Sequence, residues 1–175
     1  RHGSGPFGLY HAFRWVRRDG RGALEPVPTP DPISLDELVA YDAERALLLA
    51  NTAQFVAGYQ ANNVLIYGDR GTGKSSTIKA LANAHAAAGL RLIEVQKQHL
   101  GDYPEIIAEL AGRRERFILF VDDLSFDEHE TEYKALKAVL EGSIEARPGN
   151  VLLYATSNRR HIVQERFSDR GSPDD

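Results

Sequence analysis

The chain contains no cysteine and no methionine, and its 175 residues include a single tryptophan. Without cysteine it can form no disulfide and offers neither a thiolate metal ligand nor a cysteine nucleophile. No apolar run approaches the roughly 20 residues that a membrane-spanning helix needs, and no signal peptide is visible. We therefore expect a cytoplasmic protein with no membrane segment. Since the sequence starts at Arg1 and has no methionine, we also expect a piece of a longer protein.

The chain also lacks an excess of positive charge, because its formal net charge is −4 and its pI is about 5.9. Proteins dedicated to nucleic acid are usually basic. Two groups of arginines stand close together in the sequence, at Arg14, Arg17, Arg18 and Arg21 and at Arg113, Arg114 and Arg116. Such groups are most often solvated faces, so nucleic acid is a possible partner but not the favoured one.

Proline is concentrated in one place, since four of the eight prolines fall within residues 26–33. This composition predicts an extended connector. We interpret residues 1–25 as the end of an upstream element, with aromatic side chains at Phe7, Tyr10, Phe13 and Trp15. Residues 34–165 should form one domain with a single core, and residues 166–175 a polar tail.

Residues 68–75 carry the most specific motif, because they match the P-loop pattern G-x-x-x-x-G-K-[ST] in full. An apolar strand at residues 64–67 precedes them and an amphipathic helix follows. The glycines allow positive φ, so that backbone N–H groups can approach phosphate oxygens. Lys74 would contact the phosphates and Ser75 would bind Mg²⁺. The residues assigned to nucleotide binding are Gly68, Asp69, Arg70, Gly71, Thr72, Gly73, Lys74, Ser75 and Ser76, although an x position of this motif, such as Arg70, usually points to solvent.

A second apolar run, residues 117–121, ends in the carboxylates of Asp122 and Asp123. A strand that is apolar on both faces is typical of the centre of a parallel sheet, and ligands bind at the carboxyl ends of such strands. Asp122 would hold Mg²⁺, and Asp123 would orient or deprotonate an attacking water. The alternative is a buried strand followed by an ordinary polar helix cap.

A third apolar run, residues 151–155, is followed by Asn158, whose amide would contact the attacking water and the γ-phosphate. The alternative is a turn-forming asparagine. Strands and helices are expected to alternate from residue 64 onward. Helix-length connections of this kind predict an α/β fold in which helices cover both faces of a parallel sheet.

A P-loop, paired aspartates and a strand leading to an asparagine together resemble the AAA+ ATPases, in which this asparagine is called sensor 1. Residues 68–76, 117–126, 145–148 and 154–161 are similar to one bacterial AAA+ family, domain of unknown function 815. The resemblance covers about residues 31–161. It implies a P-loop NTPase three-layer sandwich with a central parallel sheet, ATP and Mg²⁺ as ligands, and a homo-oligomer formed through the nucleotide site.

The resemblance also implies parts that we do not find after His161, namely a fifth strand, an arginine finger and a helical lid. We therefore expect the chain to bind nucleotide better than it hydrolyses it. The leading hypothesis is an ATPase that uses Asp123, Lys74 and Asn158 to hydrolyse Mg-ATP and so drives assembly or remodelling of an unknown macromolecular partner. The alternatives are a DNA-linked helper ATPase and a nucleotide-gated scaffold with little hydrolysis.

Overall fold

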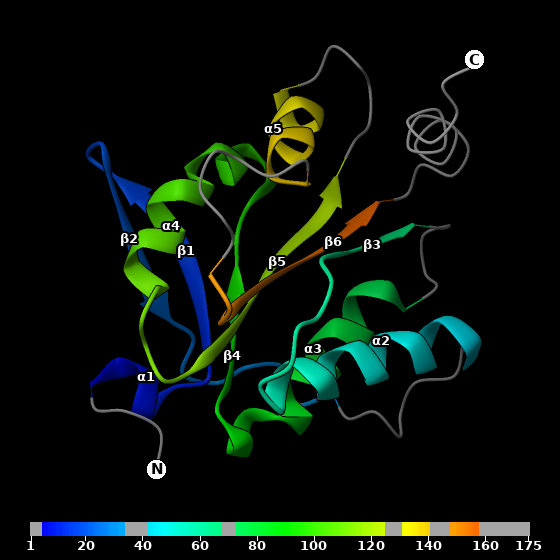
Figure 1. The fold of residues 1–175 in the computed structure, drawn as a ribbon. Coiled ribbons are helices and arrows are strands. Elements are labelled where there is room, and N and C mark those ends of the chain that lie inside the picture. The colour runs from blue at the N-terminus through cyan, green and yellow to red at the C-terminus, as the bar shows by residue number, and fades with distance from the viewer. Residues whose placement is uncertain (1–4, 34–41, 68–72, 125–130, 141–147, 158–175) are drawn as a thin grey trace, which may run out of the picture.

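A computed structural model describes residues 5–33, 42–67, 73–124, 131–140 and 148–157 of the chain (Figure 1). Its strands are β1 (Ala12–Arg18), β2 (Arg21–Pro26), β3 (Val64–Tyr67), β4 (Leu90–Glu94), β5 (Arg116–Leu124) and β6 (Val151–Ser157). Its helices are α1 (Pro6–Leu9), α2 (Asp42–Val56), α3 (Lys74–Ala84), α4 (Tyr103–Leu110) and α5 (Thr131–Leu140), with short 3₁₀ helices η2 (Ala86–Ala88) and η3 (Lys97–Asp102).

The strands form one sheet in the order β2-β1-β4-β5-β6-β3. All neighbouring strands are parallel except β1 and β2, which form an antiparallel hairpin. The expected alternation of strands and helices from residue 64 onward is confirmed. Because consecutive parallel strands need a helix-length crossover, α3, α4 and α5 each connect one strand to the next.

Helices cover both faces of this sheet, so the predicted three-layer sandwich is confirmed (Figure 1). On one face, α4 and α5 pack Ile106, Leu110 and Leu136 against the odd-numbered positions of β5 and β6. On the other face, α2 and α3 pack against the even-numbered positions of the same strands. All seven residues of β6 are buried, as expected for a strand covered on both sides.

The N-terminal residues differ from the sequence-based interpretation of an upstream element. β1 pairs directly with β4, from Ala12 opposite Leu92 to Arg14 opposite Glu94, so the hairpin extends the same sheet. Phe13 and Trp15 each retain only 1% exposure, because they belong to the core under α4. The aromatic residues of this segment therefore complete the domain.

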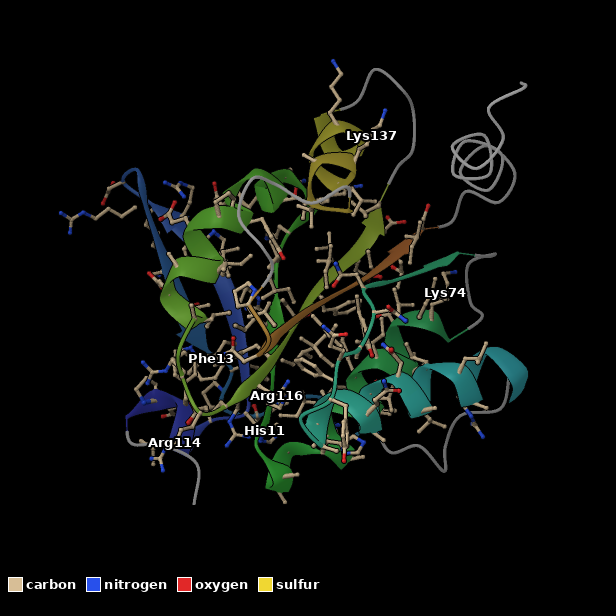
Figure 2. All side chains as sticks on the ribbon, in the orientation of Figure 1. His11, Phe13, Lys74, Arg114, Arg116 and Lys137 are labelled. Atoms are coloured by element: carbon tan, nitrogen blue, oxygen red, sulfur yellow. The ribbon has the colours of Figure 1, made fainter. Side chains whose placement is uncertain are left out.

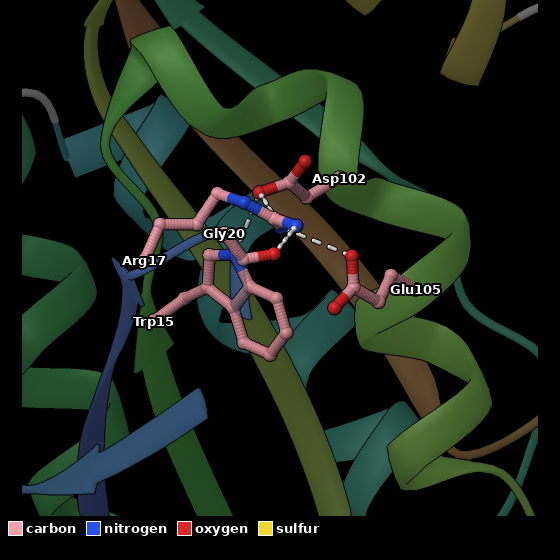
Figure 3. A network of polar contacts seen from close by, with 5 residues as sticks. All are labelled: Trp15, Arg17, Gly20, Asp102 and Glu105. Atoms are coloured by element: carbon pink, nitrogen blue, oxygen red, sulfur yellow. Dashed lines mark hydrogen bonds and ion pairs between the residues drawn. The ribbon is translucent and has the colours of Figure 1, made fainter. Parts of the chain in front are cut away.

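A polar network joins the hairpin to η3 and α4 (Figure 3). The indole nitrogen of Trp15 donates to Asp102 at 2.9 Å, and Arg17 donates to Asp102 at 2.9 Å and to Glu105 at 3.0 Å. Burial alone would raise the pKa of the Asp102 carboxyl, but the hydrogen bonds from Trp15 and Arg17 outweigh it and the pKa lies below its usual range. The hairpin is therefore bound to the sheet's helical layer as well as to β4.

The connector was predicted for residues 26–33; Pro26 is the last residue of β2, and residues 27–33 form neither helix nor strand. They are nevertheless attached to the domain, because the side-chain amide of Asn83 on α3 donates to the carbonyls of Asp31 and Ile33. A side-chain amide likewise attaches the loop between α2 and β3 to the domain. There, Asn51 of α2 bonds to both the carbonyl and the N–H of Asn62, which sets where β3 begins.

A buried tyrosine connects α2 to β6. The Tyr154 hydroxyl lies 2.8 Å from Thr52 Oγ1 and accepts from Asn51 at 3.0 Å. Burial raises the pKa of Tyr154 although both hydrogen bonds act in the opposite direction. The phenol therefore stays neutral, as a group in a dry core must.

Candidate nucleotide site

The helix α3 begins immediately after Gly73, which has φ 82° and ψ 17°. This left-handed conformation favours glycine, so the glycine expected from the P-loop pattern is required here by the backbone. The carbonyl of Gly73 accepts from both the N–H and the hydroxyl of Thr77, which closes the first turn. Thr77 therefore has an ordinary helix-start role.

Lys74, Ser75 and Ser76 form the first turn of α3, and all three are half-buried. A helix N-terminus carries partial positive charge and unpaired N–H groups, which is the arrangement that binds phosphate. Figure 2 shows Lys74 at this end of the helix. The other P-loop positions, Gly68 to Thr72, lie outside the described residues, so their assignment stays a prediction.

The paired aspartates lie at the end of β5, where the strand departs from regular pairing. Val121 pairs with Ala155 and Leu124 pairs with Ser157, so two residues of β5, Asp122 and Asp123, face the single residue Thr156 of β6. This is a β-bulge, a device that re-aims side chains near functional sites. Both aspartate side chains are exposed, whereas Val121 and Leu124 on either side are buried.

The hydroxyl of Thr156 closes this bulge. It accepts the N–H of Asp123 at 2.9 Å and donates to Oδ1 of Asp122 at 2.5 Å. Ser157 acts one position further along, donating from its hydroxyl to the Leu124 carbonyl at 2.8 Å. Side-chain hydroxyls thus replace ladder hydrogen bonds that the bulge interrupts.

The main chain of Asp123 is held from a second direction. Lys97, the first residue of η3, donates from its ammonium to the Asp123 carbonyl at 3.2 Å. Asp123 itself has φ 60°, a left-handed conformation that an aspartate adopts only at some cost. Contacts from β6 and from η3 therefore hold the carboxylate-bearing backbone in place.

The strand register brings the two halves of the site to one edge of the sheet. β6 lies between β3 and β5, and its Ser157 pairs with Tyr67 on one side and Leu124 on the other. Neighbouring strands are about 4.8 Å apart, so the ends of β3 and β5 are separated by roughly 10 Å. The P-loop follows Tyr67, and the aspartates immediately precede Leu124. Asn158 follows Ser157 in the sequence and lies outside the described residues.

The arginines of the second sequence cluster lie at the opposite end of β5. Figure 2 shows Arg114 and Arg116 far from Lys74. Arg116 donates to the Gly149 carbonyl and its guanidinium lies 4.5 Å from the centre of the Phe55 ring. Arg113 lies equally close to the Phe7 ring. Two of the three cationic side chains therefore take part in packing within the fold.

Three of the four arginines in the first cluster lie close to carboxylates. Arg14 lies 3.8 Å from Glu94, Arg17 bonds to Asp102 and Glu105, and Arg18 lies 2.7 Å from Glu25. Positive charge on the hairpin is therefore largely compensated. This arrangement weakens the case for a nucleic-acid surface, which needs uncompensated cations.

The oxygen groups at the site fit Mg²⁺, which prefers one or two carboxylates together with hydroxyl, water and phosphate oxygens. Asp122 is an exposed carboxylate and Ser75 a half-buried hydroxyl, both at the ligand-binding edge. Across the described ranges, no three histidine, aspartate or glutamate side chains gather as a metal cluster. None of the described helices is both long and apolar enough to cross a membrane.

Two site-forming residues were not found by sequence reasoning. Thr156 stands in the sequence as one of three polar residues after a strand, with no signal that it would contact Asp122. Lys97 follows a different strand, 26 residues before Asp123. Only the order of strands in the sheet brings these residues to the aspartates.

Comparison with known proteins places the chain in a family. The profile described as "Protein of unknown function (DUF815)" matches residues 8–175. The 26S proteasome regulatory subunit 4 homolog of Oryza sativa subsp. japonica is 38% identical over 66 residues, which are 35% of this chain and 15% of that protein. A 26S proteasome regulatory subunit 6B homolog of Schizosaccharomyces pombe is 35% identical over a stretch of the same length.

Solved structures share the fold. The Caenorhabditis elegans PCH-2 structure has a TM-score of 0.53 and 20% identity, and the match covers 77% of this chain and 43% of that one. A structure of AMPPCP-bound DnaA from Aquifex aeolicus has a TM-score of 0.48 and 16% identity over 78% of this chain and 48% of that one. The sequence matches and the PCH-2 structure show that the chain is similar in sequence and fold to AAA+ ATPases. The chain spans less than half the length of each of these proteins.

Proposed function

The chain belongs to the DUF815 family and is similar to AAA+ ATPases, and from this premise we propose that it binds and hydrolyses Mg-ATP. The observation that carries the proposal is that the start of α3 and the β5 bulge lie at the same end of the sheet, where the parallel strands have their carboxyl ends. A left-handed glycine opens α3 with Lys74, and two strands away the β5 bulge exposes Asp122 and Asp123. The glycine alone would fit an ordinary helix start, and the bulge alone would fit an ordinary strand end. Because both lie at the carboxyl ends of the parallel strands, the phosphates of ATP can lie between the start of α3 and the aspartates.

Each residue has a distinct chemical task in this proposal. Lys74 and the first N–H groups of α3 bind the phosphate oxygens of ATP. Asp122 and Ser75 hold Mg²⁺, which when bound neutralises charge on the β- and γ-phosphates. Asp123 orients a water and accepts its proton as the water oxygen attacks the γ-phosphorus. The bond to the β–γ bridging oxygen breaks, which leaves ADP and inorganic phosphate. Asn158 contacts the same water.

We propose that hydrolysis drives assembly or remodelling of a protein partner and that copies of the chain assemble through the nucleotide site. Similarity to AAA+ ATPases, which typically act as oligomers, supports the second statement. Light scattering of the chain with ADP and with a non-hydrolysable ATP analogue tests it. A mass that increases only with the ATP analogue is expected. An unchanged monomer mass in both would contradict assembly through the site.

Nucleotide binding by Lys74→Ala tests the proposal directly. The loss of a cationic phosphate contact should weaken ATP binding about 10- to 100-fold, since hydrogen bonds to charged groups contribute roughly 1.5–3 kcal/mol. Lys79→Ala is the matched control, because Lys79 is a half-buried lysine further along the same helix. Equal weakening by both substitutions, or by neither, would refute a phosphate site at the start of α3.

The DNA-linked alternative makes a different prediction, namely that duplex DNA stimulates hydrolysis. The pairing of Arg14, Arg17 and Arg18 with carboxylates favours no stimulation. The nucleotide-gated scaffold predicts tight ATP binding with negligible turnover, even in the presence of a partner. ATP turnover with and without DNA and the dissociation constant for ATP together separate the three functions. Turnover that DNA stimulates indicates the DNA-linked ATPase, turnover that DNA does not change indicates the leading proposal, and tight binding without turnover indicates the scaffold.

A further inference from the structure

The hydroxyl of Thr156 is the point at which both aspartates of the proposed site are joined. Thr156 is 1% exposed and comes from β6, so it is a rigid part of the core. Its side chain is β-branched, which restricts the first torsion to few rotamers. It contacts Asp122 through the carboxylate and Asp123 through the backbone. The buried hydroxyl oxygen of Thr156 thus holds both the side chain of Asp122 and the backbone of Asp123.

The direction of each hydrogen bond follows from the chemistry of the groups. The Asp123 N–H can only donate, so the Thr156 oxygen accepts there through a lone pair. The single hydroxyl proton is then available for Oδ1 of Asp122, which as a carboxylate oxygen only accepts. The Thr156 hydroxyl can therefore make both hydrogen bonds at once, because one uses its lone pair and the other uses its proton.

This arrangement distinguishes the two oxygens of Asp122. Oδ1 is engaged by Thr156, while no donor among the described residues contacts Oδ2. The carboxylate is therefore held in one orientation with a single oxygen left for Mg²⁺. A ligand fixed in advance loses less freedom when metal binds, which is why partners behind a metal ligand affect metal affinity.

The same hydroxyl also holds Asp123 in its left-handed conformation. Without the Thr156 hydroxyl, the Asp123 N–H would lose this hydrogen bond, and the backbone would gain by relaxing to an ordinary strand conformation. Relaxation would turn the Asp123 carboxylate away from the direction that the bulge gives it.

We propose that Thr156 is a positioning residue that orients Asp122 toward Mg²⁺ and Asp123 toward the attacking water. The inference rests on the proposed function. According to this inference, Thr156 affects Mg²⁺ binding and the attacking water. The hydrogen bonds of Thr156 would also be present if it only stabilised the bulge, so the test must separate the two roles.

The test compares three variants of the chain with the wild type. Thr156→Val retains the shape of the side chain and removes the hydroxyl, and Thr156→Ser retains the hydroxyl. Thr52→Val is the matched control, because Thr52 is also fully buried, and its hydroxyl contacts the Leu48 carbonyl and the Tyr154 hydroxyl away from the aspartates. The affinity for a fluorescent ATP analogue is measured with Mg²⁺ and with EDTA, beside ATP turnover and urea unfolding.

Thr156→Val should lose about 10- to 100-fold of the affinity that Mg²⁺ adds, while binding in EDTA stays within about twofold of the wild type. Turnover should fall by a similar factor. Thr156→Ser should recover most of both losses. Thr52→Val should lower the urea midpoint and leave the effect of Mg²⁺ on binding unchanged.

Combining Thr156→Val with Asp122→Asn tests whether the hydroxyl acts through the carboxylate. If it does, Thr156→Val removes little further Mg²⁺-dependent affinity once Asp122 is changed, so the two losses are not additive. Fully additive losses would overturn the inference. A Thr156→Val variant that matches the wild type, or one that Thr156→Ser fails to rescue, would overturn it as well.

The wild-type measurement separates this inference from the function on which it rests. A wild type that binds no ATP analogue would refute both. A wild type whose binding is tightened by Mg²⁺, beside a Thr156→Val variant that is tightened equally, would refute the role of Thr156 and leave the nucleotide site standing.

Discussion

Asp19 and Asp123 share an unusual backbone conformation and reach it by different means. Their φ angles are 53° and 60°, and they are the non-glycine residues with positive φ in the described part of the chain. Asp19 is followed by Gly20 with φ 77°, and together they form the two-residue turn between paired Arg18 and Arg21. Adjacent positive φ angles are typical of a type I′ hairpin turn, so this turn is local.

Asp123 has no such local explanation. It lies within β5, and its conformation depends on Thr156 and Lys97, which come from β6 and η3. The hairpin turn therefore needs only its own residues, whereas the bulge needs the assembled sheet. A backbone conformation that the wider fold must impose is more informative about function than one that local turn chemistry supplies.

The largest expected difference between the two aspartates is in ATP turnover. Asp123→Asn should slow hydrolysis about 100-fold or more, because an amide cannot accept the proton of the attacking water. Asp19→Asn should leave the rate unchanged, since its turn lies at the hairpin and asparagine tolerates the same φ. Steady-state Mg-ATP hydrolysis measures both, with nucleotide binding confirmed in each. Equal rates for Asp123→Asn and the wild type would remove Asp123 from the proposed mechanism.

The next largest effect concerns the packing of the hairpin on the domain. Gly22→Ala would place a Cβ much closer to the ring carbons of Trp15 than van der Waals contact allows, and 2.8 Å from Oε2 of Glu105. We expect a loss of about 1–3 kcal/mol in the free energy of unfolding, as for other overpacked sites. Gly101→Ala is the control, because its Cβ would meet nothing within 4 Å. Urea unfolding measures both, and an unaffected Gly22→Ala would show that the hairpin is not packed as described.

Backbone strain should account for a smaller difference. Asp123→Gly removes the cost of a left-handed aspartate, about 1 kcal/mol, while the N–H bond to Thr156 remains. We expect this variant to be as stable as the wild type or slightly more so, and inactive in hydrolysis. Asp19→Gly should change stability by less than about 0.5 kcal/mol, since aspartate already suits its turn. Thermal unfolding tests both, and a strongly destabilised Asp123→Gly would contradict strain at the bulge.

The smallest effect is the pH dependence of the hairpin network. The pKa of Asp102 is lowered in the folded chain, so its contribution to stability is present above its unfolded pKa of about 3.9 and is lost as pH falls through the folded pKa. Asp102→Asn should therefore reduce stability near neutral pH by less than about 1 kcal/mol, and this deficit should shrink below about pH 4. Urea unfolding at pH 7 and at pH 3 measures it. A deficit that does not shrink in acid would assign the effect to packing.

The strands β3, β5 and β6 could be predicted from the sequence because each is an apolar run that leads into motif residues. Val64–Tyr67 was predicted with the bounds that the structure has. The hairpin was missed although its signal was present, since Asp19-Gly20 is the strongest short turn signal and buried aromatics precede it. The proline-rich connector after β2 suggested a boundary that the sheet does not have.

The site was only partly predictable for a physical reason. The P-loop and the aspartates are contiguous in sequence, so their chemistry can be read from residue types and spacing. The bulge and its Thr156 contact depend on how β6 is aligned with β5, and a one-residue shift would turn the threonine to the other face. Register is a tertiary property, which no pattern within either strand specifies here.

The pairing of β1 with β4 has a consequence for how the chain folds as it is made. Ala12 of β1 faces Leu92 of β4, so 80 residues separate the two sides of this contact. The hairpin can close as soon as its turn is synthesised, within microseconds, yet it has no sheet to join. At 5–20 residues per second, β4 follows β1 roughly 4–16 s later. Throughout that interval Phe13 and Trp15 lack the core residues of β4 and α4 that cover them in the folded chain, which leaves this hairpin open to chaperones or to premature association.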